Sequence, residues 1–117
     1  MLHLSSLDFY GAALQTGARV ARLVAANVAN SDTPNYKARG IDFDQALAAR
    51  INGDAPASAQ YVRGLPTGLD GNDVSLSYES LQSVENSQRI RASLAFVSHD
   101  VASLITALQP QGPSNAG

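Results

Sequence analysis

Apolar residues recur at alternating steps of three and four in two long stretches, one near each end of this 117-residue chain. That spacing is typical of a helix that buries one stripe against another helix. The first stretch, over residues 6–30, comprises Leu7, Tyr10, Leu14, Gly17, Ala21, Val24 and Val28. The second, over residues 75–108, comprises Ile90, Leu94, Val97, Val101, Leu104 and Leu108, with Leu81, Val84, Ala95, Ala102 and Ile105 alongside. The pattern predicts a mainly α fold with two long terminal helices paired as an antiparallel coiled-coil hairpin.

The chain between these stretches is loop-rich, because it holds three of the five prolines and five of the nine glycines. We therefore divide the sequence into an N-terminal coiled-coil helix (1–30), an irregular middle segment with a turn and a short helix (31–74), a C-terminal coiled-coil helix (75–109) and a disordered tail (110–117). Residues 52–68 show no clear period, which predicts a flexible loop.

Capping residues predict where the helices begin and end. Serines at 5–6 offer hydroxyls for the start of the first helix, and Pro34 ends it. Asp42 is suited to cap a short helix over residues 43–50, and Ser75 to cap the last helix.

Small side chains dominate the composition. Alanine and serine together exceed a quarter of the chain, and charged residues are 15%, against about 25% in ordinary soluble domains. Gly17 costs about 1 kcal/mol of helix propensity, which makes sense where another helix passes close by. A surface with so little charge favours self-association. Two interpretations stay open: the middle segment completes a small bundle, or neighbouring subunits cover the stripes in an oligomer or tube.

The composition also excludes several classes of protein. A net charge of −2 argues against a nucleic-acid partner, since binding phosphates needs a basic face. No apolar run is long enough for membrane insertion, and the N-terminus lacks the pattern of a cleavable secretory signal. With no cysteine and two histidines, and without a nucleotide-binding or nucleophile motif, we predict no catalytic residue, no cofactor and no metal. The chain is not expected to be an enzyme.

The most distinctive stretch is ANVANSDTPNYKARGIDF, residues 26–43. Its polar side chains can bond the carbonyls freed at a helix end and form side-chain turns, and its aromatic side chains can anchor the middle segment on the helices. By itself this describes a well-capped helix end followed by a tight turn. The residues concerned are Asn27, Asn30, Thr33, Pro34, Tyr36, Asp42 and Phe43.

This stretch resembles the N-terminal signature of bacterial flagellar axial proteins of the rod and hook class, in the version typical of the proximal rod. A second match supports the resemblance, because LDGNDV at residues 69–74 is similar to the element that precedes the C-terminal helix in that class. NSQR at 86–89 falls where the class has an N-x-x-R stretch. Asn35 replaces a usual glycine, and asparagine tolerates a left-handed backbone. Ile90 stands where an aromatic residue is common.

The resemblance implies a structural subunit that pairs its terminal helices as a coiled coil and stacks helically in the rod of the flagellar basal body. It implies export through the flagellar type III apparatus without a cleavable signal peptide, a periplasmic place in the rod, and ends that order on assembly. The implied partners are copies of itself, other rod proteins, the rod-base adaptor, the MS ring and the export gate. The residues predicted to act in assembly and packing are Leu14, Val24, Asn27, Val28, Asn30, Thr33, Pro34, Tyr36, Asp42, Phe43, Leu69, Asp70, Gly71, Asn72, Val74, Leu94, Val97, Val101 and Leu104.

Two alternatives stand beside this hypothesis. Another axial subunit of the rod and hook class would share the first motif, and the LDGN element favours the proximal-rod type over it. A small cytoplasmic helical adaptor or chaperone would instead fold and remain soluble alone, with its helical ends already ordered.

Overall fold

The computed structural model describes residues 2–110, and side chains from residue 6 onward. Along the chain the elements are α1 (Leu2–Ala29), β1 (Arg39–Gly40), α2 (Phe43–Asn52), β2 (Gln60–Tyr61) and α3 (Leu76–Leu108). The mainly helical fold is confirmed, with two long terminal helices that pack together. Of the tail predicted to be disordered, residues 111–117 lie outside the described part.

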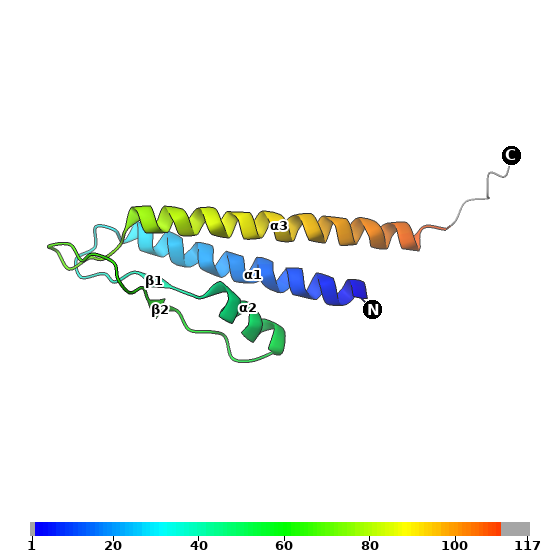
Figure 1. The fold of residues 1–117 in the computed structure, drawn as a ribbon, viewed down its shortest axis with the longest axis horizontal. Helices are drawn as coiled ribbons and strands as arrows, with labels where there is room; N and C mark the ends of the chain where they lie inside the picture. Colours follow the sequence, from blue (N-terminus) through cyan, green and yellow to red (C-terminus); the bar gives the residue numbers. More distant parts are fainter. Residues whose placement is uncertain (1, 111–117) are drawn as a thin grey trace.

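Helices α1 and α3 lie side by side along the long axis of a molecule that measures 79 × 30 × 18 Å (Figure 1). Three contacts mark their length. Asn27 bonds Glu79 at one end, Asn86 bonds Gly17 in the middle, and the Tyr10 ring stacks on Phe96 with centroids 5.0 Å apart. The pairing therefore extends over most of α1.

The predicted caps of the second and third helices are confirmed. Asp42 Oδ1 accepts from the Gln45 amide at 2.8 Å, and Ser75 Oγ accepts from the Tyr78 amide at 3.2 Å. The start of the first helix is earlier than predicted, because α1 begins at Leu2 and the serines at 5–6 lie within it. Its last hydrogen-bonded turn closes where the Asn30 amide bonds the Ala26 carbonyl.

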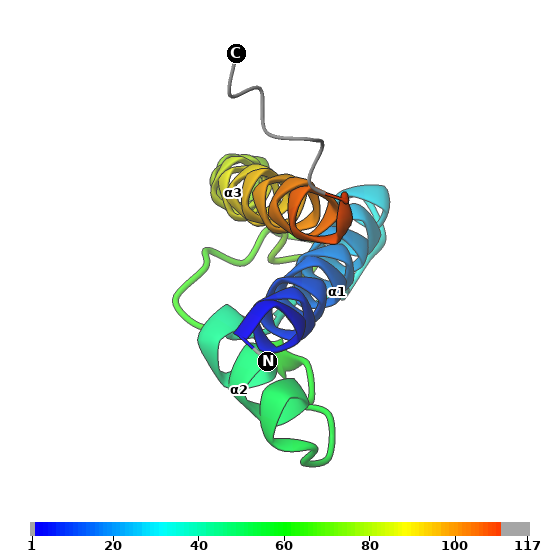
Figure 2. The same ribbon diagram turned by 90° about the vertical axis from the view of Figure 1, so that its right-hand side faces the viewer.

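The middle segment is more regular than predicted. Helix α2 packs on α1 with Ala46 buried, and β1 pairs antiparallel with β2 in the register Arg39 to Tyr61. Residues 52–68, predicted to be an unstructured loop, thus contain a strand, because Ala38 and its neighbours offer backbone partners from far along the chain. Figure 2 shows α1 between α3 on one side and α2 on the other.

The core is small. Among the described residues, the buried apolar side chains are Ala12, Ala13, Val20, Ala38 and Ala46. Each of these buries little area, so each contributes little to stability at about 25 cal/mol per Å².

The seam that α3 presents to α1 corrects the predicted stripe. Buried polar residues recur every seven positions along it, at Glu79, Asn86 and Ser93. The inner apolar positions, four residues further along, are the partly buried Ile90, Val97 and Leu104.

The other predicted stripe residues of α3, Leu94, Val101 and Leu108, are exposed and do not line this seam. The physical reason is the polar contacts of Glu79 and Asn86 with α1, which set the rotation of α3. On α1, Leu14 and Val24 are partly buried, whereas Ala21 and Val28 are exposed.

Candidate functional site

The two motifs singled out in the sequence meet where α1 ends and α3 begins, and Asn27 lies at their centre. Its amide group donates to the Arg39 carbonyl at 2.7 Å and to Glu79 Oε1 at 2.8 Å. Its Oδ1 accepts from the Arg39 amide at 3.0 Å and from the Tyr36 hydroxyl at 3.2 Å. This uses all four hydrogen-bonding positions of an asparagine side chain. One buried residue thereby joins α1, β1 and α3.

A second asparagine, Asn72, closes the end of α1. Its side-chain amide donates to the carbonyls of Asn30 and Thr33, each at 2.8 Å, and its Oδ1 accepts from the Val74 amide at 2.8 Å. Carbonyls at the end of a helix lack partners within the helix. Asn72 supplies such a partner and ties the segment before α3 to the segment after α1.

Backbone contacts continue this connection. Asp73 Oδ1 accepts from the Ala38 amide at 2.6 Å, and the Asp73 amide donates to the Tyr36 carbonyl at 3.2 Å. The Asn35 amide donates to the Asp70 carbonyl at 2.9 Å. We call the hydrogen-bonded set formed by residues 27–39 and 69–79 the polar junction.

Two left-handed residues face each other in the polar junction. Asn35 has a φ of 63° and Gly71 a φ of 80°. The tolerance predicted for asparagine at position 35 is therefore used. A Cβ on Gly71 would overlap Asn35 Oδ1, so residue 71 needs glycine both for its backbone angle and for its space.

Glu79 brings a carboxyl group into the polar junction, and its side chain is only 2% exposed. Burial raises the pKa of this carboxyl above its usual value, and the hydrogen bond from Asn27 opposes that rise. Because burial disfavours the charged form, the folded junction favours a protonated Glu79.

Along the helix seam, Gly17 allows close approach. The Asn86 side-chain amide donates to the Gly17 carbonyl at 2.9 Å. A Cβ on Gly17 would come within 2.8 Å of Ile90 Cγ1. The helix-propensity cost of this glycine is thus accompanied by a close contact with α3, as the sequence predicted.

The chemistry available at these sites is limited to hydrogen bonding and packing. Within the part of the chain that is described, no three histidine, aspartate or glutamate side chains gather as a metal site would require. None of the described helices combines the length and apolarity needed to cross a membrane.

Curated relatives agree with the sequence motifs. No family model matches the chain. It is 32% identical to the flagellar basal body rod protein FlgB of Aeromonas hydrophila, with 83% of this chain and 87% of that protein aligned. FlgB of Cereibacter sphaeroides strain ATCC 17029 is 35% identical over 74% of this chain and 80% of its own. FlgB of Escherichia coli K12 is 31% identical, with 90% and 94% covered.

The chain belongs to the FlgB family. Members of this family are flagellar basal body rod proteins, so the chain is a structural protein of the flagellar basal body. The motifs that suggested the resemblance, at 26–43 and 69–74, are the ones that the structure brings together in the polar junction.

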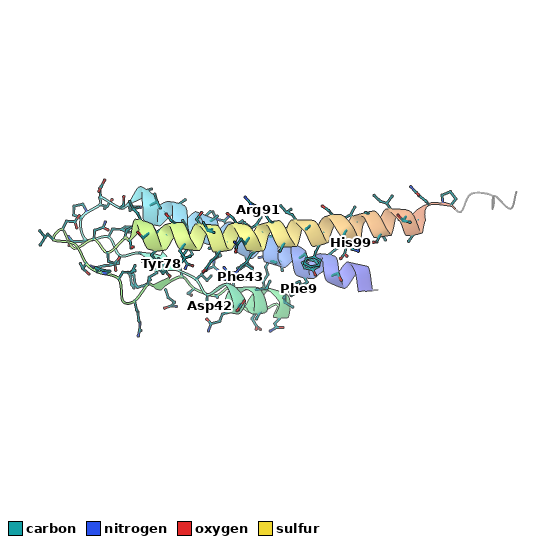
Figure 3. The ribbon with its side chains drawn as sticks, turned by 45° about the horizontal axis from the view of Figure 1, so that its top comes forward. Phe9, Asp42, Phe43, Tyr78, Arg91 and His99 are labelled. Carbon is teal, nitrogen blue, oxygen red and sulfur yellow. The ribbon has the colours of Figure 1, made fainter. Side chains whose placement is uncertain are left out.

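The remaining residues predicted from the FlgB-type motifs have varied surroundings. Thr33 donates its hydroxyl to Asn30 Oδ1 at 3.0 Å, and Pro34 is exposed beside it. Phe43 lies at the start of α2 beside Asp42 (Figure 3), and the Arg89 guanidinium covers its ring at 4.8 Å. Leu69 is fully exposed. The motif residues therefore include both junction residues and surface residues.

Sequence reasoning missed Glu79 and Asp73 as junction residues of this FlgB family member, and Asn86 as a residue of the seam. Glu79 and Asn86 are seven residues apart, so a polar heptad position was the available signal. Arg89 was predicted to pair with Glu85 on the same helix, yet its guanidinium lies over Phe43 instead.

Proposed function

We propose that this FlgB-family protein is a structural, non-enzymatic subunit of the proximal part of the flagellar rod, where it assembles helically with copies of itself and other rod proteins. The observation that carries the proposal is the large apolar surface of a single chain. Large apolar side chains left exposed are unusual unless a partner covers them. On α3 alone they are Leu76, Leu81, Val84, Leu94, Phe96, Val101, Ile105 and Leu108.

The terminal helices form, in this proposal, an antiparallel coiled-coil hairpin. Its support is the order of the contacts, in which later residues of α1 meet earlier residues of α3: Asn27 with Glu79, Gly17 with Asn86, and Tyr10 with Phe96. The seven-residue spacing of the α3 seam residues also supports it.

The polar junction holds the closed end of this hairpin and sets the course of the middle segment. Asn27 and Asn72 each connect three chain segments, so the helices cannot separate at this end without breaking several buried hydrogen bonds. The assembly residues outside it, Leu14, Val24, Val28, Leu94, Val97, Val101 and Leu104, are proposed to stabilise the hairpin where they are buried and to meet neighbours where they are exposed.

The remaining parts of the proposal rest on the resemblance to the axial class. The chain leaves the cell through the flagellar type III apparatus without a cleavable signal peptide and occupies the periplasmic rod. There it meets the rod-base adaptor, the MS ring and the export gate, and neither a nucleic acid nor the membrane interior is a partner.

The test is localisation in a flagellated cell. The gene is deleted, the tagged chain is returned on a plasmid, and purified basal bodies are probed for it. We expect the chain in the basal body, and no rod in the deletion strain. A chain that stays in the cytoplasm, with intact rods in the deletion strain, would contradict the proposal and favour the adaptor.

A further inference from the structure

Leu69 is a fully exposed leucine at the tip of a turn that is held by its own hydrogen bonds. The Gly68 amide donates to the Asn72 carbonyl at 2.7 Å, and the Gly71 amide to the Gly68 carbonyl at 3.0 Å. The Asn72 amide adds a bond to Asp70 Oδ1 at 3.1 Å. An apolar side chain on an ordered turn loses little conformational entropy when it binds, which suits a protein contact.

A complementary cleft of about 840 Å³ lies between α1 and α2. Small residues, Gly11 and Ala12, contribute to its α1 wall, and a Cβ built on Gly11 meets nothing within 4 Å. Apolar side chains at its border are Leu7, Ile51 and Pro56. The space above Gly11 and the apolar border suit an inserted leucine.

The charges beside the two surfaces also match. Asp70 and Lys37 flank Leu69, with Lys37 Nζ bonded to the Gly71 carbonyl at 2.5 Å. Arg50 and Asp54 line the cleft. Each surface therefore offers one acidic and one basic group to the other, which favours a single orientation.

The two surfaces lie apart along the molecule. The turn is at the end where α1 leads into β1, whereas the cleft lies where α2 covers the first half of α1 (Figure 1). Leu69 thus cannot fill the cleft of its own chain. A contact between different patches on identical chains is heterologous, and it repeats as an open series.

We propose that Leu69 of one copy inserts into the α1–α2 cleft of a second copy of this chain. The inference rests on the proposed function, because an open series of copies needs an assembled rod. It assigns the exposed leucine of the LDGN motif, which contributes nothing to the fold of a single chain, to a specific contact between subunits.

Disulfide cross-linking tests the contact, since the chain has no cysteine of its own. Leu69→Cys and Ile51→Cys are combined in a plasmid-borne copy in a flagellated cell that lacks the gene, and purified basal bodies are oxidised. We expect a ladder of cross-linked multiples on a non-reducing gel. The Ile51→Cys single variant, as matched control, should give none.

The outcomes separate the two proposals. A chain present in basal bodies without a cross-link overturns the Leu69 contact and leaves the rod function standing. A product that stops at the dimer overturns the heterologous geometry, and a cross-link to a different protein overturns the second copy as occupant. A cysteine-free chain absent from basal bodies contradicts the rod function, and the contact with it.

A second variant measures the effect of the leucine itself. Leu69→Ser should leave the unfolding midpoint of the free chain unchanged and weaken self-association by about 10- to 100-fold, as expected for the loss of one buried leucine. Thr67→Ala, an exposed change near the same turn, is the matched control. Wild-type incorporation of Leu69→Ser into rods would overturn the inference.

Discussion

Asn27 on α1 donates a hydrogen bond of 2.8 Å to the carboxyl of Glu79 on α3, and both side chains are almost completely buried. These residues lie 52 positions apart in the sequence. Their contact closes one end of the helix pair with polar groups, where a hydrophobic contact is the more common choice.

Replacing Asn27 by alanine should destabilise the chain strongly. The change removes four hydrogen bonds and leaves Glu79 and the Arg39 backbone without their partner. We expect a loss of about 2–4 kcal/mol in the free energy of unfolding, measured by urea denaturation, because unsatisfied buried groups are costly. Asn30→Ala, which removes only exposed bonds, is the matched control and should cost less than about 1 kcal/mol. Equal losses would contradict the central role of Asn27.

The buried carboxyl of Glu79 should make stability fall as pH rises. Burial raises the pKa of Glu79 in the folded chain above its unfolded value, so the folded state binds this proton more tightly. The contribution is complete below the unfolded pKa and is lost as pH rises through the folded pKa.

Glu79→Gln keeps a side-chain oxygen for Asn27 and removes the titration. We expect the variant to gain stability over the wild type progressively as pH is raised from about 4.5, the ordinary value of the carboxyl. Unfolding midpoints at several pH values measure this, with Glu85→Gln on the same helix as control for the change in net charge. A constant difference between variant and wild type across this range would refute the assignment.

Two glycines of α1 should respond in opposite ways to alanine. Gly17→Ala brings a Cβ within 2.8 Å of Ile90 Cγ1, and we expect a net loss of about 1–2 kcal/mol, since overpacking outweighs the gain in helix propensity. Gly11→Ala meets nothing within 4 Å and should stabilise the chain by up to about 1 kcal/mol. Thermal unfolding of both variants measures the contrast. Stabilisation by both would show that Gly17 is not a close-approach site.

The two apolar stripes of α3 should separate folding from assembly. Val97→Asp places a charge at a partly buried seam position and should lower the stability of the free chain by about 2–4 kcal/mol. Val101→Asp adds the same charge on the exposed stripe, where we expect less than about 0.5 kcal/mol but loss of rod assembly. Circular dichroism on the purified chains and motility of complemented cells give the two readouts. Motile cells carrying Val101→Asp would exclude the exposed stripe from assembly.

Much of the helical framework could be predicted locally. The caps at Asp42 and Ser75 act through side-chain bonds to residues three positions later, and the left-handed Asn35 follows from the tolerance of asparagine for that backbone. Such interactions depend on neighbours in the sequence. The start of α1 and the strand β2 were missed, because competing local signals and a partner 22 residues away decide them.

The rotation of α3 could not be predicted in this way. Ile90, Val97 and Leu104 repeat every seven residues, and so do Leu94, Val101 and Leu108 four positions along. Either set can face a partner helix. Hydrogen bonds from Asn86 to Gly17 and from Asn27 to Glu79 select the first set.

The sequence alone determined that this chain forms two long terminal helices around a loop-rich middle, and its motifs identified the flagellar axial class, because helical period, capping and motif spacing are local properties. Only the tertiary structure decided that the two motifs clasp each other through Asn27 and Asn72, and that α3 turns polar residues inward and leucines outward. These outcomes depend on the hydrogen-bond partners that distant segments supply, and a linear pattern does not contain that geometry.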